Sequence, residues 1–224
     1  MPFWSRRPKD PDAWLREGAA YYRRLGWFAE WIDLSEEQLL RKVIELLEEE
    51  GNTRPDPTDQ SADVSLMALD DERVWWNDLE ADVCRENQVY VELVEALGRI
   101  SRGAIIVADV TERWDGEEGP ITVEFTANGA RQTVHPRYQD DWITEEAFLA
   151  FERLLRPTPY GLYTWDTQGQ DYFCVVLRED EARLIRKQRG VALSLDLNGA
   201  QAKLAREIGC AFEERVLHRQ FLGP

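Results

Sequence analysis

Apolar residues in the first fifty positions recur with the period of an α-helix. Over residues 12–32 they share one face, which predicts a first helix. A second helix has a clear start signal, because Ser35 can act as its N-cap and Gln38 stands three residues later, as a capping box requires. The pattern therefore predicts an N-terminal helical unit over residues 1–52.

A polar segment follows this unit. Residues 53–61 contain two prolines and no large apolar side chain, which is typical of a linker. We therefore place a boundary there and expect residues 62–224 to form one domain. This domain is predicted to end in a helix over residues 198–217, where apolar residues stand four apart.

The first part of this domain mixes short apolar runs with one long helical pattern. We expect strands at residues 64–69 and 103–109 and a helix over residues 78–100, whereas residues 73–76 fit either another strand or the lead into that helix.

Two hairpins give the strongest β signal. Apolar and polar residues alternate over 121–126, and Asn128-Gly129 then supplies the two positive-φ positions of a tight turn before a return strand over 131–135. A second hairpin is expected from the runs 160–165 and 172–177.

Helices are predicted over residues 144–155 and 179–189, each with acidic residues in its first turn, where the helix dipole favours negative charge. Adjacent hairpins imply antiparallel pairing. The predicted class is α+β, with a mixed or mainly antiparallel sheet, helices packed on one face, and the N-terminal helical unit before it.

Charge is concentrated in the middle of the chain. The formal net charge is −16, and residues 33–146 hold 29 acids and 10 bases. Such a field repels nucleic acids and anionic membranes and attracts basic partners, although acidic surfaces also simply keep proteins in solution. No apolar run approaches the roughly 18 residues of a membrane span, and the N-terminus lacks an apolar signal stretch. Three cysteines without close spacing fit reduced thiols, so we expect a cytoplasmic protein.

Motifs for catalysis or cofactor binding do not stand out. Phosphate-binding glycine loops and the His-Glu-x-x-His zinc motif do not occur, and there are only two histidines. His135 with Cys84 or Cys174 is a conceivable nucleophilic pair, and neighbouring carboxylates could serve acid–base work. We expect no catalytic residue, no metal and no cofactor, and leave a carboxylate-based hydrolase as an alternative.

Tryptophans beside carboxylates form the main candidate site. Trp and Tyr are frequent at binding hot spots, and neighbouring acids select a basic partner, but each ring could equally belong to the core. The candidate partner-binding residues are Trp75, Trp76, Asp78, Trp114, Asp115, Glu117, Glu118, Asp140, Asp141 and Trp142.

Three stretches of the chain carry a resemblance. Residues 74–83 (Val-Trp-Trp-Asn-Asp-Leu-Glu-Ala-Asp-Val), residues 121–129 and residues 169–177 are similar to small uncharacterised α+β proteins of bacteria, some of which resemble immunity proteins of polymorphic toxin systems. The resemblance spans residues 62–190 and leaves the N-terminal unit out. It implies a cytosolic inhibitor that forms a tight one-to-one complex with a basic toxin and performs no catalysis.

Three classes of function follow from these observations. The first is a non-catalytic acidic binding protein that engages a basic protein partner, but neither nucleic acid nor a membrane. The second is a structural or regulatory subunit of an assembly, which an exposed apolar patch around Trp27 and Trp31 would favour. The third is an enzyme. A homo-oligomer is compatible with each of them.

Overall fold

The computed structural model describes residues 10–49, 56–57, 59, 61–167 and 169–195. In these ranges the chain has the predicted α+β class, and its strands form two antiparallel sheets instead of the single sheet that was expected. The helices are α1 (Pro11–Arg24), the short 3-10 helix η2 (Ala29–Trp31), α2 (Glu36–Glu49), α3 (Ala62–Ala68), α4 (Val89–Ile100), α5 (Glu146–Leu155) and α6 (Glu179–Arg189). The strands are β1 (Val74–Asp78), β2 (Val107–Trp114), β3 (Ile121–Ala127), β4 (Ala130–Val134), β5 (Tyr160–Trp165) and β6 (Asp171–Arg178).

The first sheet has the strand order β1-β6-β5. Both of its pairs are antiparallel, and Trp75 lies opposite Cys174 while Tyr163 lies opposite Val175. The strands β5 and β6 form the second predicted hairpin. β1 joins them from a distant part of the chain, because its apolar side chains find partners on both faces of this sheet.

The second sheet has the order β2-β3-β4. The turn between β3 and β4 is the predicted one, with φ of 50° at Asn128 and 80° at Gly129. The pairing of β2 with β3 shifts register between Ala108 and Thr111, which marks a β-bulge.

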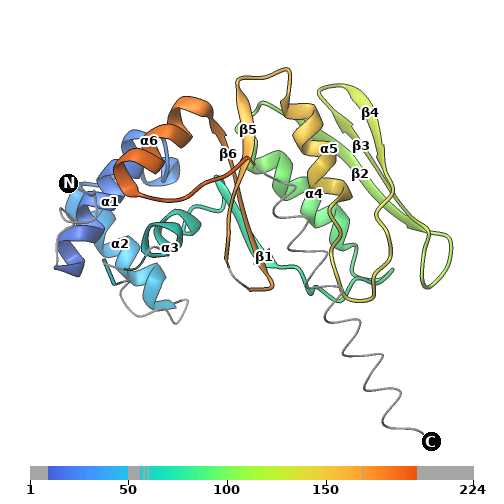
Figure 1. The fold of residues 1–224 in the computed structure, drawn as a ribbon, viewed down its shortest axis with the longest axis horizontal. Helices are drawn as coiled ribbons and strands as arrows, with labels where there is room; N and C mark the ends of the chain where they lie inside the picture. The colour runs from blue at the N-terminus through green and yellow to red at the C-terminus, as the bar shows by residue number, and fades with distance from the viewer. Residues whose placement is uncertain (1–9, 50–55, 58, 60, 168, 196–224) are drawn as a thin grey trace, which may run out of the picture.

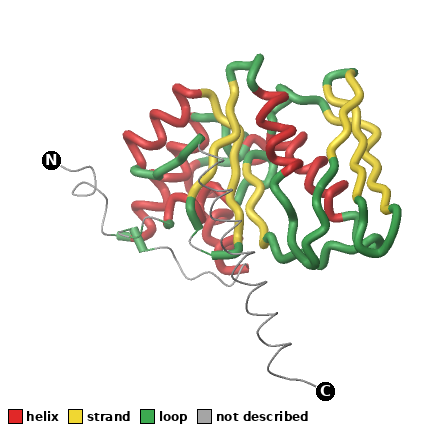
Figure 2. The backbone as a smooth tube through the Cα atoms, turned by 45° about the vertical axis from the view of Figure 1, so that its right-hand side comes forward, coloured by secondary structure: helices red, strands yellow, loops and turns green. Residues whose placement is uncertain are grey.

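Four layers result from this topology (Figure 1). Helices α1, α2, α3 and α6 cover one face of the first sheet, helices α4 and α5 lie between the two sheets, and the second sheet forms the far side. Figure 2 shows the same alternation of helical and strand layers. The expected cover on one face therefore applies to the second sheet, whereas the first sheet is covered on both faces.

Two buried clusters follow from these layers. Side chains alternate along β6, so Phe173 and Val175 face what we call the N-terminal core, which includes α1, α2, α3 and α6. Cys174 and Val176 face the opposite way, into the C-terminal core, which includes α4, α5 and the inner face of the second sheet. The N-terminal helices thus dock on the α+β domain instead of forming a separate arm.

Local signals placed several helix ends correctly. The backbone N–H of Ser35 donates to Gln38 Oε1 at 2.9 Å, and the N–H of Gln38 donates to Ser35 Oγ at 3.3 Å, which completes the predicted capping box. Gly190 ends α6 with φ of 77°, in the left-handed conformation that glycine adopts without a steric penalty.

Several sequence predictions were wrong. The helix expected over residues 12–32 ends at Arg24, and the strand expected over residues 103–109 begins only at Val107. Of the strand expected over residues 64–69, residues 64–68 belong to the short helix α3 and Leu69 is its C-cap, because a brief apolar run fits a buried helix as well as a buried strand.

The helix expected from residue 78 begins only at Val89, because the preceding residues pair with another loop through a β-bridge from Glu80 to Trp142. The predicted helix over residues 198–217 and most of the predicted linker lie outside the described residues.

The length and hydropathy of the described helices bear on whether any of them could span a membrane. None of them is both long and apolar enough to cross a bilayer.

Candidate functional site

The tryptophan pair of β1 points to opposite faces of the first sheet, as expected for neighbouring strand residues. The Trp75 ring is buried in the C-terminal core, with its centroid 5.4 Å from that of Phe148. Trp76 is half-buried against the N-terminal core, 6.0 Å from the ring of Phe173. Asp78 is exposed at the end of the strand, where its Oδ1 accepts a hydrogen bond from the N–H of Glu80 at 2.8 Å.

The second candidate group lies at the turn between β2 and β3. Trp114 is buried, and its indole N–H donates to Glu112 Oε1 at 2.7 Å. Asp115, Glu117 and Glu118 follow it on the turn and are exposed. Along this stretch of the chain, a buried ring is thus followed by three solvent-exposed carboxylates.

The third candidate group lies in the loop before α5. Trp142 is buried, whereas Asp140 is exposed and Asp141 is half-buried. The loop is tied to the segment after β1, because Ala81 donates its N–H to the carbonyl of Asp141 at 2.6 Å. These backbone contacts bring the first and third groups to the same side of the molecule.

Tyr138 joins the second and third groups. Its ring packs edge-to-face on Trp114, with centroids 5.7 Å apart. Desolvation raises the pKa of its hydroxyl, and the nearby carboxylates of Asp140, Glu118 and Asp141 raise that pKa further. The ring contact with Trp114 places the loop that carries Asp140 and Asp141 beside the turn that carries Asp115, Glu117 and Glu118.

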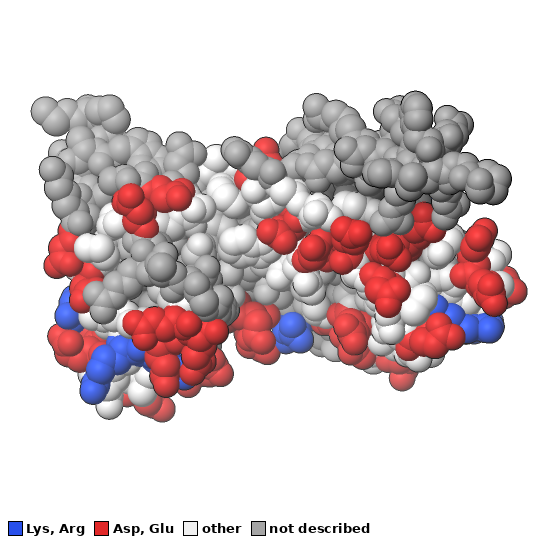
Figure 3. Space-filling view, turned by 90° about the horizontal axis from the view of Figure 1, so that it is seen from below, with Lys and Arg blue, Asp and Glu red and all other residues white. Residues whose placement is uncertain are grey.

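We call this set of carboxylates the acidic edge, and it comprises Asp78, Glu80, Asp115, Glu117, Glu118, Asp140 and Asp141. Figure 3 views the molecule from below, where acidic side chains clearly outnumber basic ones. Sequence reasoning missed Glu80 and the junction residue Tyr138. The bridge between Glu80 and Trp142 joins residues far apart in the chain, so no local signal could have revealed it.

Bases near the acidic edge are few and already engaged. The Arg85 guanidinium donates to the carbonyl of Trp114 at 3.1 Å. Arg137 bonds Glu145 and Glu146, each at 2.7 Å, at the start of α5. The side chains of Asp115 and Glu117 make no hydrogen bond or ion pair within the described ranges, so their charge faces solvent.

The tryptophans have a different role from the one first considered. Trp75, Trp114 and Trp142 are each no more than 8% exposed. The core alternative left open by the sequence therefore holds for these three rings. They pack in the C-terminal core, whereas Asp115, Glu117, Glu118 and Asp140 stay exposed.

The sequence left open an exposed apolar patch around Trp27 and Trp31, but neither ring is exposed. Trp27 is fully buried, and the guanidinium of Arg73 lies over its ring at 3.9 Å from the centroid. Trp31 is half-buried and stacks on Phe28, with centroids 5.3 Å apart. This part of the surface therefore does not favour an assembly subunit.

Groups suited to catalysis lie apart in the structure. Burial strongly raises the pKa of the Cys174 thiol, which disfavours the reactive thiolate. His135 is exposed, and its Nδ1 lies 3.4 Å from the hydroxyl of Thr122 in the second sheet. In the part of the chain that the structure describes, no three His, Cys, Asp or Glu residues are arranged to hold a metal ion.

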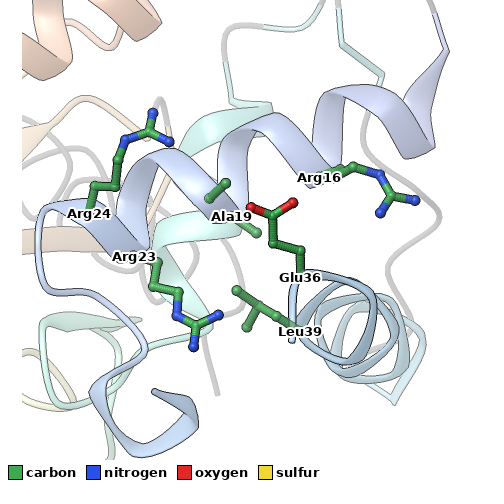
Figure 4. Close-up of a pocket in the computed structure, with 7 residues that line it drawn as sticks. Arg16, Ala19, Arg23, Arg24, Glu36 and Leu39 are labelled. Atoms are coloured by element: carbon green, nitrogen blue, oxygen red, sulfur yellow. The ribbon is translucent and has the colours of Figure 1, made fainter. Parts of the chain in front are cut away.

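A cleft of about 360 Å³ separates α1 from α2 and contains several arginines. Its cations already have partners, because Arg16 forms an ion pair with Glu37 at 2.5 Å and Arg23 donates to the carbonyl of Ile32. Figure 4 shows Glu36 pointing into the cleft between these two arginines, whereas Arg24 points away from α2. Arg16 and Arg23 are therefore engaged within the protein, and Arg24 lies over the Tyr21 ring, 5.9 Å from its centroid.

Comparisons with protein families, with curated proteins and with solved structures find no match to this chain. Its function must therefore be inferred from the chain's own chemistry.

Proposed function

We propose that the protein is a non-catalytic binding protein whose acidic edge engages a basic protein partner. The observation that carries this proposal is the gathering of carboxylates from three separate segments on one side of the molecule, beside buried tryptophans. Backbone contacts tie the segment after β1 to the loop before α5, and the packing of Tyr138 on Trp114 joins the turn between β2 and β3 to that loop, so the backbone that carries the carboxylates is set before binding. A prearranged set of charges loses less conformational entropy when a partner arrives.

Electrostatic steering is the main expected effect of this edge. Exposed charges are screened over about 8–10 Å at physiological salt, and a single exposed pair contributes only about 0–1 kcal/mol. Several like charges together raise the association rate with an oppositely charged partner, and that rate falls as salt increases. The acidic edge therefore favours fast recognition of a basic surface.

The sharpest form of this proposal is an immunity-like protein in a bacterial cytoplasm. Its partner would be a basic toxin, which it would neutralise in a one-to-one complex by covering the toxin's active surface. The resemblance of residues 74–83, 121–129 and 169–177 to such proteins supports this form, as does the net charge of −16.

The test is an affinity pull-down from lysate of the native host at low and moderate salt, read by mass spectrometry. We expect one basic protein at stoichiometric level, with less recovered as salt rises. Reversal of Asp115, Glu117 and Glu118 to Lys should slow association with the purified partner about tenfold or more at low salt.

A matched control separates local recognition from net charge. Asp33, Glu48 and Glu49 are exposed and lie around α2, remote from the acidic edge. Their reversal to Lys changes the net charge equally and should leave much of the association rate intact. Equal slowing by both triple variants, or none by the first, would contradict the proposal that the acidic edge is the contact surface.

A further inference from the structure

A second surface lies at the opposite end of β2 from the acidic edge. β2 is an edge strand of its sheet, next to α4 (Figure 1). Among the described residues, the backbone of Val107–Val110 forms no hydrogen bond to any segment other than β3. An open strand edge can pair with an extended peptide from another protein.

A groove of about 320 Å³ runs along this open edge. One wall is the C-terminal half of α4, and the other is formed by residues 105–110. A Cβ atom at Gly98 would lie only 2.6 Å from Val107 Cγ2, so this glycine lets the helix and the strand meet closely at the floor. The groove is thus a built feature of the packing of α4 on β2.

Ile106 makes the groove apolar at its entrance. Its side chain is 67% exposed, the highest value for a large apolar residue in the described ranges. The backbone beside it is held in place, because the Ile106 N–H donates to Asn128 Oδ1 at 2.8 Å and its carbonyl accepts from the Asn128 N–H at 2.9 Å. A rigid, exposed isoleucine beside an open strand edge fits an apolar contact with a partner.

The charges around the groove indicate which occupant it takes. Glu95 and Asp109 line it and are exposed, and Asp109 Oδ2 accepts a hydrogen bond from the Thr126 hydroxyl at 3.4 Å. Arg99 also lines it, but its guanidinium is engaged by Glu72, at 3.7 Å, and by the carbonyl of Asp71, at 3.2 Å. A second copy of this chain would bring the same two carboxylates against each other. A basic segment would instead meet opposite charges, so charge complementarity favours a basic occupant.

We propose that this groove binds a short extended segment of a partner protein, in which an apolar side chain contacts Ile106 and flanking Lys or Arg residues face Glu95 and Asp109. The segment is short because the bulge between Ala108 and Thr111 interrupts the straight edge of β2. This proposal does not rest on the acidic edge, which lies beyond the other end of the strand.

The experiment uses a phage-displayed library of random peptides, selected on the full chain and counter-selected on its Ile106→Asp variant. We expect enriched peptides that alternate apolar residues with Lys or Arg. Fluorescence anisotropy with the synthesised peptides should show a loss of affinity of at least about tenfold in Ile106→Asp. Ile32→Asp is the matched control, because Ile32 is 60% exposed but does not line the groove, and it should leave affinity unchanged.

Charge variants test the rest of the proposal. Glu95→Gln with Asp109→Asn should weaken binding severalfold and reduce its salt dependence. Asn is chosen at position 109 because it tolerates the φ of 54° found there. The triple reversal of Asp115, Glu117 and Glu118 should leave peptide affinity unchanged, so failure at the groove is distinguishable from failure at the acidic edge.

Several outcomes would overturn the groove proposal. They are an absence of enriched peptides, equal binding to the Ile106→Asp variant with circular dichroism unchanged, and enrichment of Asp and Glu. Sedimentation that shows a dimer of the full chain, abolished by Ile106→Asp, would assign the groove to a second copy instead.

Discussion

The two cores on either side of the first sheet differ in how they treat polar groups. The buried charged side chains of the described residues lie on α3, on the connection from α3 to β1, and on α6, and they are Asp63, Asp70, Arg73, Glu181 and Arg189. The buried polar side chains beside the C-terminal core are neutral, as at Ser101 and Thr144. Among the described residues, the C-terminal core therefore holds no fully buried charged side chain, and the carboxylates of Glu112 and Glu146 beside it are half-buried.

The difference follows from how the elements of each core are joined. Helices α1, α3 and α6 come from distant parts of the chain and share no backbone ladder. Asp63 joins them, because it accepts hydrogen bonds from Arg189 Nε at 2.6 Å and from the Tyr22 hydroxyl at 3.0 Å. Each core contains a face of the first sheet, and the C-terminal core also contains the inner face of the second sheet. In the N-terminal core, directed polar contacts join helices that no ladder connects.

Breaking the ion pair between Asp63 and Arg189 should have the largest effect on stability. Arg189→Met leaves the Asp63 carboxylate buried without its cation, so we expect the free energy of unfolding to fall by about 3–5 kcal/mol. The measurement is urea unfolding followed by tryptophan fluorescence. The triple variant Arg189→Met, Asp63→Leu, Tyr22→Phe removes the whole polar group and should recover most of this loss. A single variant that loses under about 1 kcal/mol would contradict the role assigned to the pair.

The matching test in the C-terminal core should have a smaller effect. The Tyr90 hydroxyl accepts from the N–H of Thr144 at 3.0 Å and lies 3.0 Å from its Oγ1. Tyr90→Phe leaves a buried N–H without its acceptor, so we expect a loss of about 1–3 kcal/mol in the same unfolding experiment. Tyr163→Phe is the control, since its hydroxyl makes no hydrogen bond within the described ranges, and should change stability by under about 0.5 kcal/mol. If Tyr90→Phe lost as much stability as Arg189→Met, the contrast between the two cores would be wrong.

The smallest expected effect is a change in the pH dependence of stability at Asp70, a buried carboxyl of the N-terminal side. Burial raises the pKa of this carboxyl above 3.8, although its Oδ2 accepts from the N–H of Phe28 at 2.5 Å. The folded state therefore binds the proton more tightly than the unfolded state, and stability falls as pH rises from 3.8 through the folded pKa.

Asp70→Asn removes this contribution and keeps an oxygen to accept from Phe28. The stability of the variant relative to the native chain should increase over that pH window and stay constant above it, as urea titrations at a series of pH values would measure. A constant difference for Asp70→Asn would mean that its pKa is the same in both states.

Elements with local signals were predicted from the sequence, and the site was predicted only in part. The capping box at Ser35, the turn at Asn128 and the end of α6 at Gly190 depend on residues a few positions apart, so their physics is contained in a short window. The acids of the candidate site were identified as chain segments, but nothing in the sequence showed which of them meet. The burial of Trp114 and Trp142 depends on Tyr138 and on the bridge to Glu80, which are distant contacts.

The sequence by itself determined the α+β class, most strands and helices, and the concentration of negative charge in residues 33–146. The tertiary structure decided that the strands form two sheets, that residues 64–68 are helical, and that Asp63 meets Arg189 across 126 positions of the chain. The division has one physical cause. The hydrogen bonds of helix caps and turns, and the steric preferences of single residues, act between near neighbours in the chain. Burial and the contacts inside the cores instead involve residues that only the folded chain brings together.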